Sequence, residues 1–179
     1  MKSNPPRNYA WAFSRPRRGF RPTTAFGLAW LLILVLVQQA HAQSTVDEIL
    51  SRAEPPGGVV FEIVEGREAA LATLMPRVRQ HVARLRARFP GLEIALVAHG
   101  AEQFALQTSR QDVFPELHAL TETLVADDVP IHVCGTHAGW RGISAEDFPD
   151  YVDVTPAGPA QINQYLELDY ELVVIDLAD

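Results

Sequence analysis

Apolar residues recur along the chain at two spacings. Short apolar runs bounded by Pro, Gly or polar turns predict strands, and longer stretches with apolar residues every three or four positions predict helices. The predicted strands are Val59–Val64, Leu92–Ala98, Ile131–Val133, Tyr151–Val154 and Tyr170–Ile175, and the predicted helices between them are Glu68–Phe89, Val113–Ala126 and Pro159–Leu168. Strands that alternate with helices predict an α/β fold, with a mostly parallel five-stranded sheet and helices on both faces.

The pattern indicates one domain preceded by a short helix. Thr45 followed by Asp47 and Glu48 is typical of a helix start, and Pro55-Pro56-Gly57-Gly58 breaks the chain before the first strand. We therefore expect a helix and linker over residues 43–57 and the α/β domain over residues 58–179. Pro76 lies inside the first long helical pattern, so this segment is expected to be kinked or divided into two helices.

Residues 1–42 differ from the rest of the chain. They contain a basic region, the uncharged apolar run Ala25–Val37 and the small-x-small sequence Ala40-His41-Ala42. This combination predicts a secretory signal peptide that is cleaved after Ala42, and hence a periplasmic protein. An uncleaved anchor is the weaker alternative, because the run of 13 residues is shorter than the roughly 20 that span a membrane.

Two export routes fit this leader. Arg17-Arg18-Gly19-Phe20 resembles a twin-arginine signal, which would export a folded protein. The very apolar core Leu31–Val37 favours the general secretory route. Both routes remain open at this stage.

Removal of the leader makes the protein strongly acidic. The leader holds six of the 15 Lys and Arg residues and none of the 22 Asp and Glu residues, which leaves a mature net charge of −13. A domain this acidic is a poor ligand for nucleic acid, whose phosphates require a basic patch. It is also repelled by anionic lipid, so we expect neither nucleic-acid nor membrane binding after cleavage.

The chain has a single cysteine, Cys134, at the end of the third predicted strand. One cysteine excludes an internal disulfide. A lone cysteine in an exported protein is a reactive thiol, an intermolecular bridge or a buried inert residue.

The carboxyl ends of parallel strands are where α/β proteins bind ligands. His99 directly follows the second strand, and Cys134 ends the third, so both are expected at one edge of the sheet. Thr136 could cap a helical turn whose N–H groups stabilise a thiolate, and His137 is close enough to exchange a proton. The candidate catalytic residues are therefore Cys134, His99 and His137.

Two alternatives remain for these residues. His132, Cys134 and His137, together with His99, are ligand types that zinc or copper accepts, but they lack the paired spacing of a known zinc motif. The other alternative is structural, with the cysteine and histidines filling space and capping backbone groups. The sequence contains no G-x-G-x-x-G, P-loop, G-x-S-x-G or H-E-x-x-H motif, and we predict neither a cofactor nor a metal.

Two surface features, an arginine run and a tryptophan, each have two interpretations. The first long helix carries Arg77, Arg79, Arg84, Arg86 and Arg88, which form either a docking face or, more commonly, a solvated face. Trp140, just after the cysteine loop, either covers a pocket or lies in a subunit interface.

Three segments resemble the DsrE/DsrF-like family of sulfur-relay subunits and small YchN-like proteins. They are an apolar strand ending in His99-Gly100, a strand opening after Val129-Pro130 and ending in Cys134-Gly135, and the tail from Val152-Asp153-Val154 through Tyr165-Leu166 to Tyr170. The resemblance covers about 115 residues, Val59–Ile175, and is firmest from Ile94.

This resemblance implies a three-layer α/β/α fold and a homotrimer or homohexamer. In sulfur-relay members the cysteine that matches Cys134 carries sulfur as a persulfide, and His99 matches a frequent histidine. A sulfur donor or acceptor protein is then a partner. The predicted export departs from the cytoplasmic relay proteins. Two functions follow: a thiol-based sulfur carrier or redox protein using Cys134, or a non-enzymatic oligomeric module that binds a small ligand or a protein.

Overall fold

The computed structural model describes residues 43–178, so the predicted signal peptide lies outside the described part. Within it, five strands form one sheet in the order β4-β3-β2-β1-β5, and all neighbouring strands are parallel. The strands are β1 (Gly58–Ile63), β2 (Ile94–Ala98), β3 (Ile131–Cys134), β4 (Asp153–Thr155) and β5 (Tyr170–Val174). The predicted α/β fold with five strands is confirmed, and the sheet is entirely parallel.

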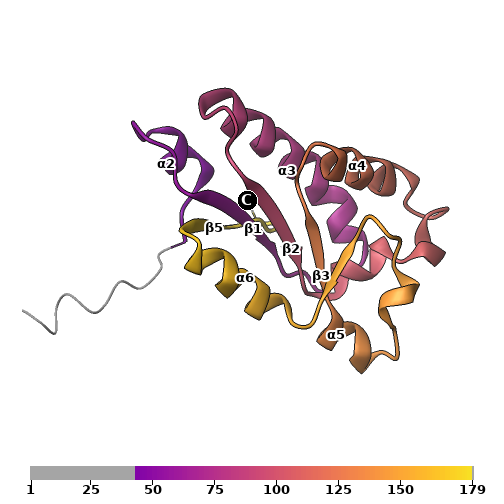
Figure 1. Cartoon of the computed structure of the whole chain (residues 1–179). Helices are drawn as coiled ribbons and strands as arrows, with labels where there is room; N and C mark the ends of the chain where they lie inside the picture. Colours follow the sequence, from indigo (N-terminus) through magenta and orange to yellow (C-terminus); the bar gives the residue numbers. More distant parts are fainter. Residues whose placement is uncertain (1–42, 179) are drawn as a thin grey trace, which may run out of the picture. The chain divides into compact units, whose positions relative to one another are not determined.

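Helices cover both faces of this sheet (Figure 1). The α-helices are α2 (Val46–Leu50), α3 (Ala69–Arg88), α4 (Pro115–Ala126), α5 (Gly135–Trp140) and α6 (Gly158–Glu167). Helices α3 and α4 pack on one face, where the larger core lies, and α6 packs on the other against Val60, Ala95 and Val97. The predicted three layers are therefore present.

Two segments differ from the sequence-based prediction. The predicted loop after β2 contains the 3-10 helices η1 (Ala101–Leu106) and η2 (Thr108–Arg110), which are too short to show a helical period in the sequence. Helix α3 is one continuous helix that contains Pro76, so the division into two helices is wrong. Pro76 lies on its exposed side, where water can satisfy the carbonyl that proline leaves unpaired. A third 3-10 helix is η3 (Ala145–Asp147).

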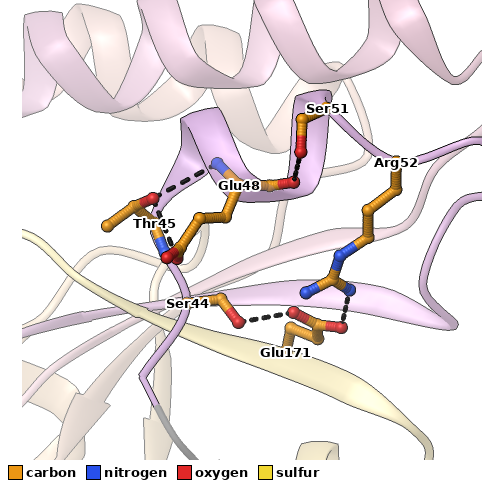
Figure 2. A network of polar contacts seen from close by, with 6 residues as sticks. All are labelled: Ser44, Thr45, Glu48, Ser51, Arg52 and Glu171. Carbon is orange, nitrogen blue, oxygen red and sulfur yellow. Dashed lines mark hydrogen bonds and ion pairs between the residues drawn. The ribbon is translucent and has the colours of Figure 1, made fainter.

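The chain just after the predicted cleavage position is part of the fold. Thr45 and Glu48 form the capping box that starts α2, as the sequence predicts. The Ser44 hydroxyl donates to the Glu171 carboxylate at 2.7 Å, and Arg52 forms an ion pair with the same carboxylate (Figure 2). The Ser44 backbone N–H also donates to Leu172 O at 3.0 Å. These contacts attach the N-terminal segment to the edge strand β5.

The arginines of α3 bind neighbouring segments. Arg77 donates to the carbonyl of Asp176, and Arg86 donates to the carbonyls of Leu92, Asp127 and Asp128. Arg84 pairs with Asp47 at 2.5 Å, and Arg88 donates to the carbonyl of Arg52. Much of this basic run therefore fixes loops and α2 to the helix, a role that neither sequence interpretation included. No helix within residues 43–178 is long and apolar enough to cross a membrane.

Candidate functional site

The site lies at the carboxyl ends of β2, β3 and β4. Ala98 pairs with Val133, so His99 and Cys134 follow on adjacent strands at the same edge, and Cys134 pairs with Thr155 of β4. Beyond Cys134 the chain packs Ala138 and Phe148 into the core on the α3 side, whereas β4 leads into α6 on the opposite face. Connections that diverge to opposite faces mark the place where parallel sheets bind ligands.

Cys134 is itself the N-cap of α5. Its Sγ accepts a hydrogen bond from the backbone N–H of His137 at 3.4 Å, and the residue is 5% exposed. The predicted cap was Thr136, and this is wrong, because the Thr136 hydroxyl donates instead to Pro156 O at 2.7 Å. Strand β3 runs directly into α5, which places the cysteine at the cap position. The sulfur thereby satisfies one of the free backbone N–H groups at the start of α5.

A buried carboxamide holds the cysteine backbone. The N–H of Cys134 donates to Oε1 of Gln103 at 2.7 Å, and Gln103 is 0% exposed. The neighbouring Glu102 is equally buried and accepts from the backbone N–H groups of Gly100 and Glu65. Burial raises the pKa of Glu102, although these two donors oppose the shift. Neither residue was singled out from the sequence, where they look like part of a polar loop.

His99 is held by a carboxylate from the neighbouring strand. Its Nε2 lies 2.8 Å from Oε1 of Glu62, and both side chains are largely buried. The first residue of α6 covers the ring, because a Cβ on Gly158 would lie 2.5 Å from His99 Cβ. The sequence analysis did not identify Glu62 as a site residue. The feature that could have indicated it is that Glu62 is the single acidic residue inside the apolar strand Val59–Val64.

His137 connects the two predicted residues. Its Nδ1–H donates to the backbone carbonyl of His99 at 3.0 Å, and its ring meets the edge of Phe104 with centroids 5.1 Å apart. The outer side of His137 contacts Trp140, which is 79% exposed. Trp140 therefore projects from the surface, which fits the subunit-interface interpretation better than that of a lid.

His132 belongs to a separate contact on the α6 face. Its Nε2 lies 2.8 Å from the Tyr165 hydroxyl, and its Nδ1 lies 3.7 Å from Asp153. Burial lowers the pKa of His132, against a smaller opposing effect of Asp153. Residues 43–178 contain no group of three or more His, Cys, Asp or Glu side chains that could hold a metal ion.

The structure thus brings together all three sequence-predicted site residues. Cys134 and His137 are joined by a hydrogen bond, and His137 is bonded to His99. Two partners that the sequence analysis missed complete the arrangement, Glu62 on His99 and Gln103 on Cys134. The hydrogen bonds of His137 to Cys134 and to His99 both use a backbone atom, and they place a capped thiol at the same sheet edge as two histidines, one of which has a carboxylate partner. A thiol in this setting suits a nucleophile or a carrier of a small group.

Fold and site define a small parallel α/β protein with one thiol at a strand end. The sequence profile of the DsrE/DsrF-like family matches residues 65–175, and the chain belongs to this family. No curated protein sequence matches the chain significantly.

Two solved structures share the fold. The protein of unknown function MTH1491 from Methanobacterium thermoautotrophicum is 22% identical, with a TM-score of 0.53 over 65% of this chain and 96% of its own. The ychN protein from E. coli is 20% identical, with a TM-score of 0.50 over 65% of this chain and 98% of its own. At this identity the likeness supports the fold, and the predicted DsrE-like architecture is confirmed.

Proposed function

We propose that this protein is an exported sulfur carrier in which Cys134 accepts and passes on a sulfur atom as a persulfide. The observation that carries the proposal is the N-cap position of Cys134, whose sulfur accepts the N–H of His137 at the ligand-binding edge of the sheet. Family membership supports it, because sulfur relay is a function of related proteins.

The transfer needs no external oxidant or reductant. The Cys134 thiolate attacks the outer sulfur of a persulfide donor R–S–SH, forms Cys134–S–SH and releases R–S⁻. A thiol acceptor then attacks the outer sulfur of Cys134–S–SH, and Cys134 leaves as the thiolate. Each step exchanges one S–S bond for another.

His99 and His137 have supporting roles in this proposal. The backbone N–H of His137 stabilises negative charge on the sulfur, and its ring, which binds His99 O, fixes the turn that carries this N–H. Glu62 holds the His99 ring at the same edge. His99 and His137 are then the groups that exchange protons with incoming thiols.

The burial of the Cys134 sulfur restricts which sulfur donors can reach it. Cys134 is 5% exposed, and four surface hollows of 310 to 720 Å³ are lined by other residues. Small sulfur species reach such a site most readily. We further propose a homotrimer or homohexamer, in which the exposed Trp140 beside His137 contacts another subunit or the partner protein that supplies sulfur.

The burial of Cys134 also supports a second candidate, an oligomeric binding module with a structural cysteine. In that case the sulfur serves as the cap of α5. Its function would then survive Cys134→Ser, because the serine hydroxyl is a good N-cap.

Alkylation of the purified chain separates the two functions. Intact mass is measured after iodoacetamide treatment across pH, with and without prior exposure to polysulfide, and sulfide alone, which forms no persulfide without an oxidant, is the control. Reaction of the folded protein at neutral pH, with gain of one sulfur atom that is absent in Cys134→Ser, is the expected result. A thiol that reacts only in denaturant and takes up no sulfur would overturn the carrier proposal and leave the binding module.

A further inference from the structure

The carboxamide of Gln103 has one satisfied end and one unsatisfied end. Its Oε1 accepts the Cys134 N–H at 2.7 Å. Because a peptide N–H can only donate, the atom that faces it must be the oxygen, and the amide orientation is fixed. The Nε2 group, buried with the rest of this 0% exposed residue, has no hydrogen-bond partner among residues 43–178.

An unpaired buried amide is costly. Leaving such a donor unsatisfied costs the full desolvation penalty of the group, so it marks either a functional group or a missing ligand. Here the unpaired NH₂ belongs to the same planar group that binds the Cys134 backbone, and it therefore lies beside the residue that bears the thiol. A ligand that fills this vacant contact must bring an acceptor next to Cys134.

We propose that Gln103 Nε2 is the hydrogen-bond donor for the outer sulfur of a persulfide on Cys134. This inference rests on the proposed function. The outer sulfur of Cys134–S–S⁻ is an anionic acceptor that the free thiol lacks, so the contact forms only once sulfur has been added. Gln103 then binds the loaded form selectively, while its oxygen keeps the cysteine backbone in place.

The variant Gln103→Glu distinguishes the acceptor role of the side chain from its donor role. The variant keeps an oxygen acceptor for the Cys134 N–H and replaces the NH₂ donor with a carboxylate oxygen. We expect it to fold and to be alkylated, but to lose its added sulfur at neutral pH about tenfold faster than the wild type, because hydrogen bonds to charged groups are roughly twice as strong as those between neutral groups. At acidic pH the protonated carboxyl regains a donor, and the ratio of lifetimes returns toward one.

The measurement is the lifetime of the added sulfur by intact mass after polysulfide is replaced by a fixed concentration of a small thiol, which attacks the outer sulfur so that Cys134 leaves as the thiolate. Gln164→Glu, an exposed position on α6, is the matched control and should behave as the wild type. Gln103→Met has no donor at any pH, so its loss should show no acid recovery. Because it also lacks the acceptor for the Cys134 N–H, its value is as a negative test: a sulfur lifetime equal to that of the wild type would overturn the role of Gln103 even if Gln103→Glu does not fold.

The outcomes are distinct. A wild-type protein that takes up no sulfur would overturn the carrier function itself. A wild type that takes up sulfur, with lifetimes unchanged in Gln103→Glu and Gln103→Met, would overturn the role of Gln103 alone. Faster loss in Gln103→Glu without acid recovery would also overturn the donor role, because a carboxylate could then be acting through its charge.

Discussion

The Glu62 carboxylate lies 2.8 Å from Nε2 of His99, across the central strands β1 and β2. Both side chains are largely buried, so each satisfies a polar group that water reaches poorly. The pair fixes His99 at the sheet edge, one strand away from Cys134. It is therefore the contact through which β1, which carries no predicted site residue, contributes to the site.

Replacing Glu62 should destabilise the protein. Glu62→Ala leaves His99 Nε2 without its partner and is expected to lower the free energy of unfolding by about 1–3 kcal/mol, the cost of an unsatisfied buried polar group. Glu62→Gln keeps an acceptor and should cost less. Urea denaturation measures both, with exposed Glu54→Ala as the control. Equal stability of Glu62→Ala and the wild type would mean that the contact contributes nothing.

Gly158 should tolerate no side chain. A Cβ there would lie 2.5 Å from Cβ and 2.8 Å from Cγ of His99, so α6 or the ring must move. Gly158→Ala is expected to cost about 1–3 kcal/mol, typical of overpacking. The control is Gly139→Ala in α5, where a Cβ meets nothing within 4 Å, and it should stabilise the helix by about 0.5–1 kcal/mol. Thermal unfolding of the two variants should shift in opposite directions.

The elements of the fold were predictable because their signals are local. Apolar runs between proline and glycine turns located the five strands within about two residues. The position of Cys134 and His99 at one edge followed from the parallel connections. The capping box at Thr45 and Glu48 was equally visible, since it spans one turn of chain.

The partners of the site were not predictable, because they come from distant segments. Glu62 is 37 positions from His99, and Gln103 is 31 positions from Cys134. No spacing rule connects residues across such separations, and the pairs meet only once the sheet and the connection after β2 have formed. The mistaken cap at Thr136 has a different cause. No residue pattern indicated that α5 starts directly after β3, and this direct start makes Cys134 the cap.

His118 should make stability depend on pH. It is buried, accepts from the Tyr151 hydroxyl through Nδ1 at 2.5 Å and donates from Nε2 to Ala105 O at 3.0 Å. Burial lowers its pKa, so the unfolded chain binds a proton more readily than the folded protein. This contribution is present above the unfolded pKa of about 6.5 and is lost as pH falls through the lower folded pKa.

The test is the slope of unfolding free energy against pH between about 7 and 5, around the histidine pKa. The wild type should lose stability as pH falls, with His132 and His81 adding to the effect because burial also lowers the pKa of each. His118→Gln should be less stable at pH 7 and show a shallower slope. A slope identical to that of the wild type would contradict the assignment.

Glu171 should account for the attachment of the N-terminal segment. Its carboxylate accepts the Ser44 hydroxyl and pairs with Arg52 (Figure 2). Glu171→Gln removes the charge but keeps the shape, and is expected to cost about 0.5–1 kcal/mol, since the pair is partly exposed. Glu167→Gln on the exposed side of α6 is the control. Hydrogen exchange should also rise in α2 in Glu171→Gln and stay unchanged in Glu167→Gln.

Glu171, like His118, should make the protein less stable as pH falls, but the cause is a hydrogen bond to a charged group and not burial. The Arg52 hydrogen bond lowers the pKa of Glu171, so the folded protein releases the proton more readily than the unfolded chain. Its contribution is present above the unfolded pKa of about 4.3 and is lost as pH falls through the lower folded pKa. The stability difference between the wild type and Glu171→Gln should therefore shrink in acid. A difference that stays constant from neutral pH into the acid range would show that charge is not what holds the N-terminal segment to β5.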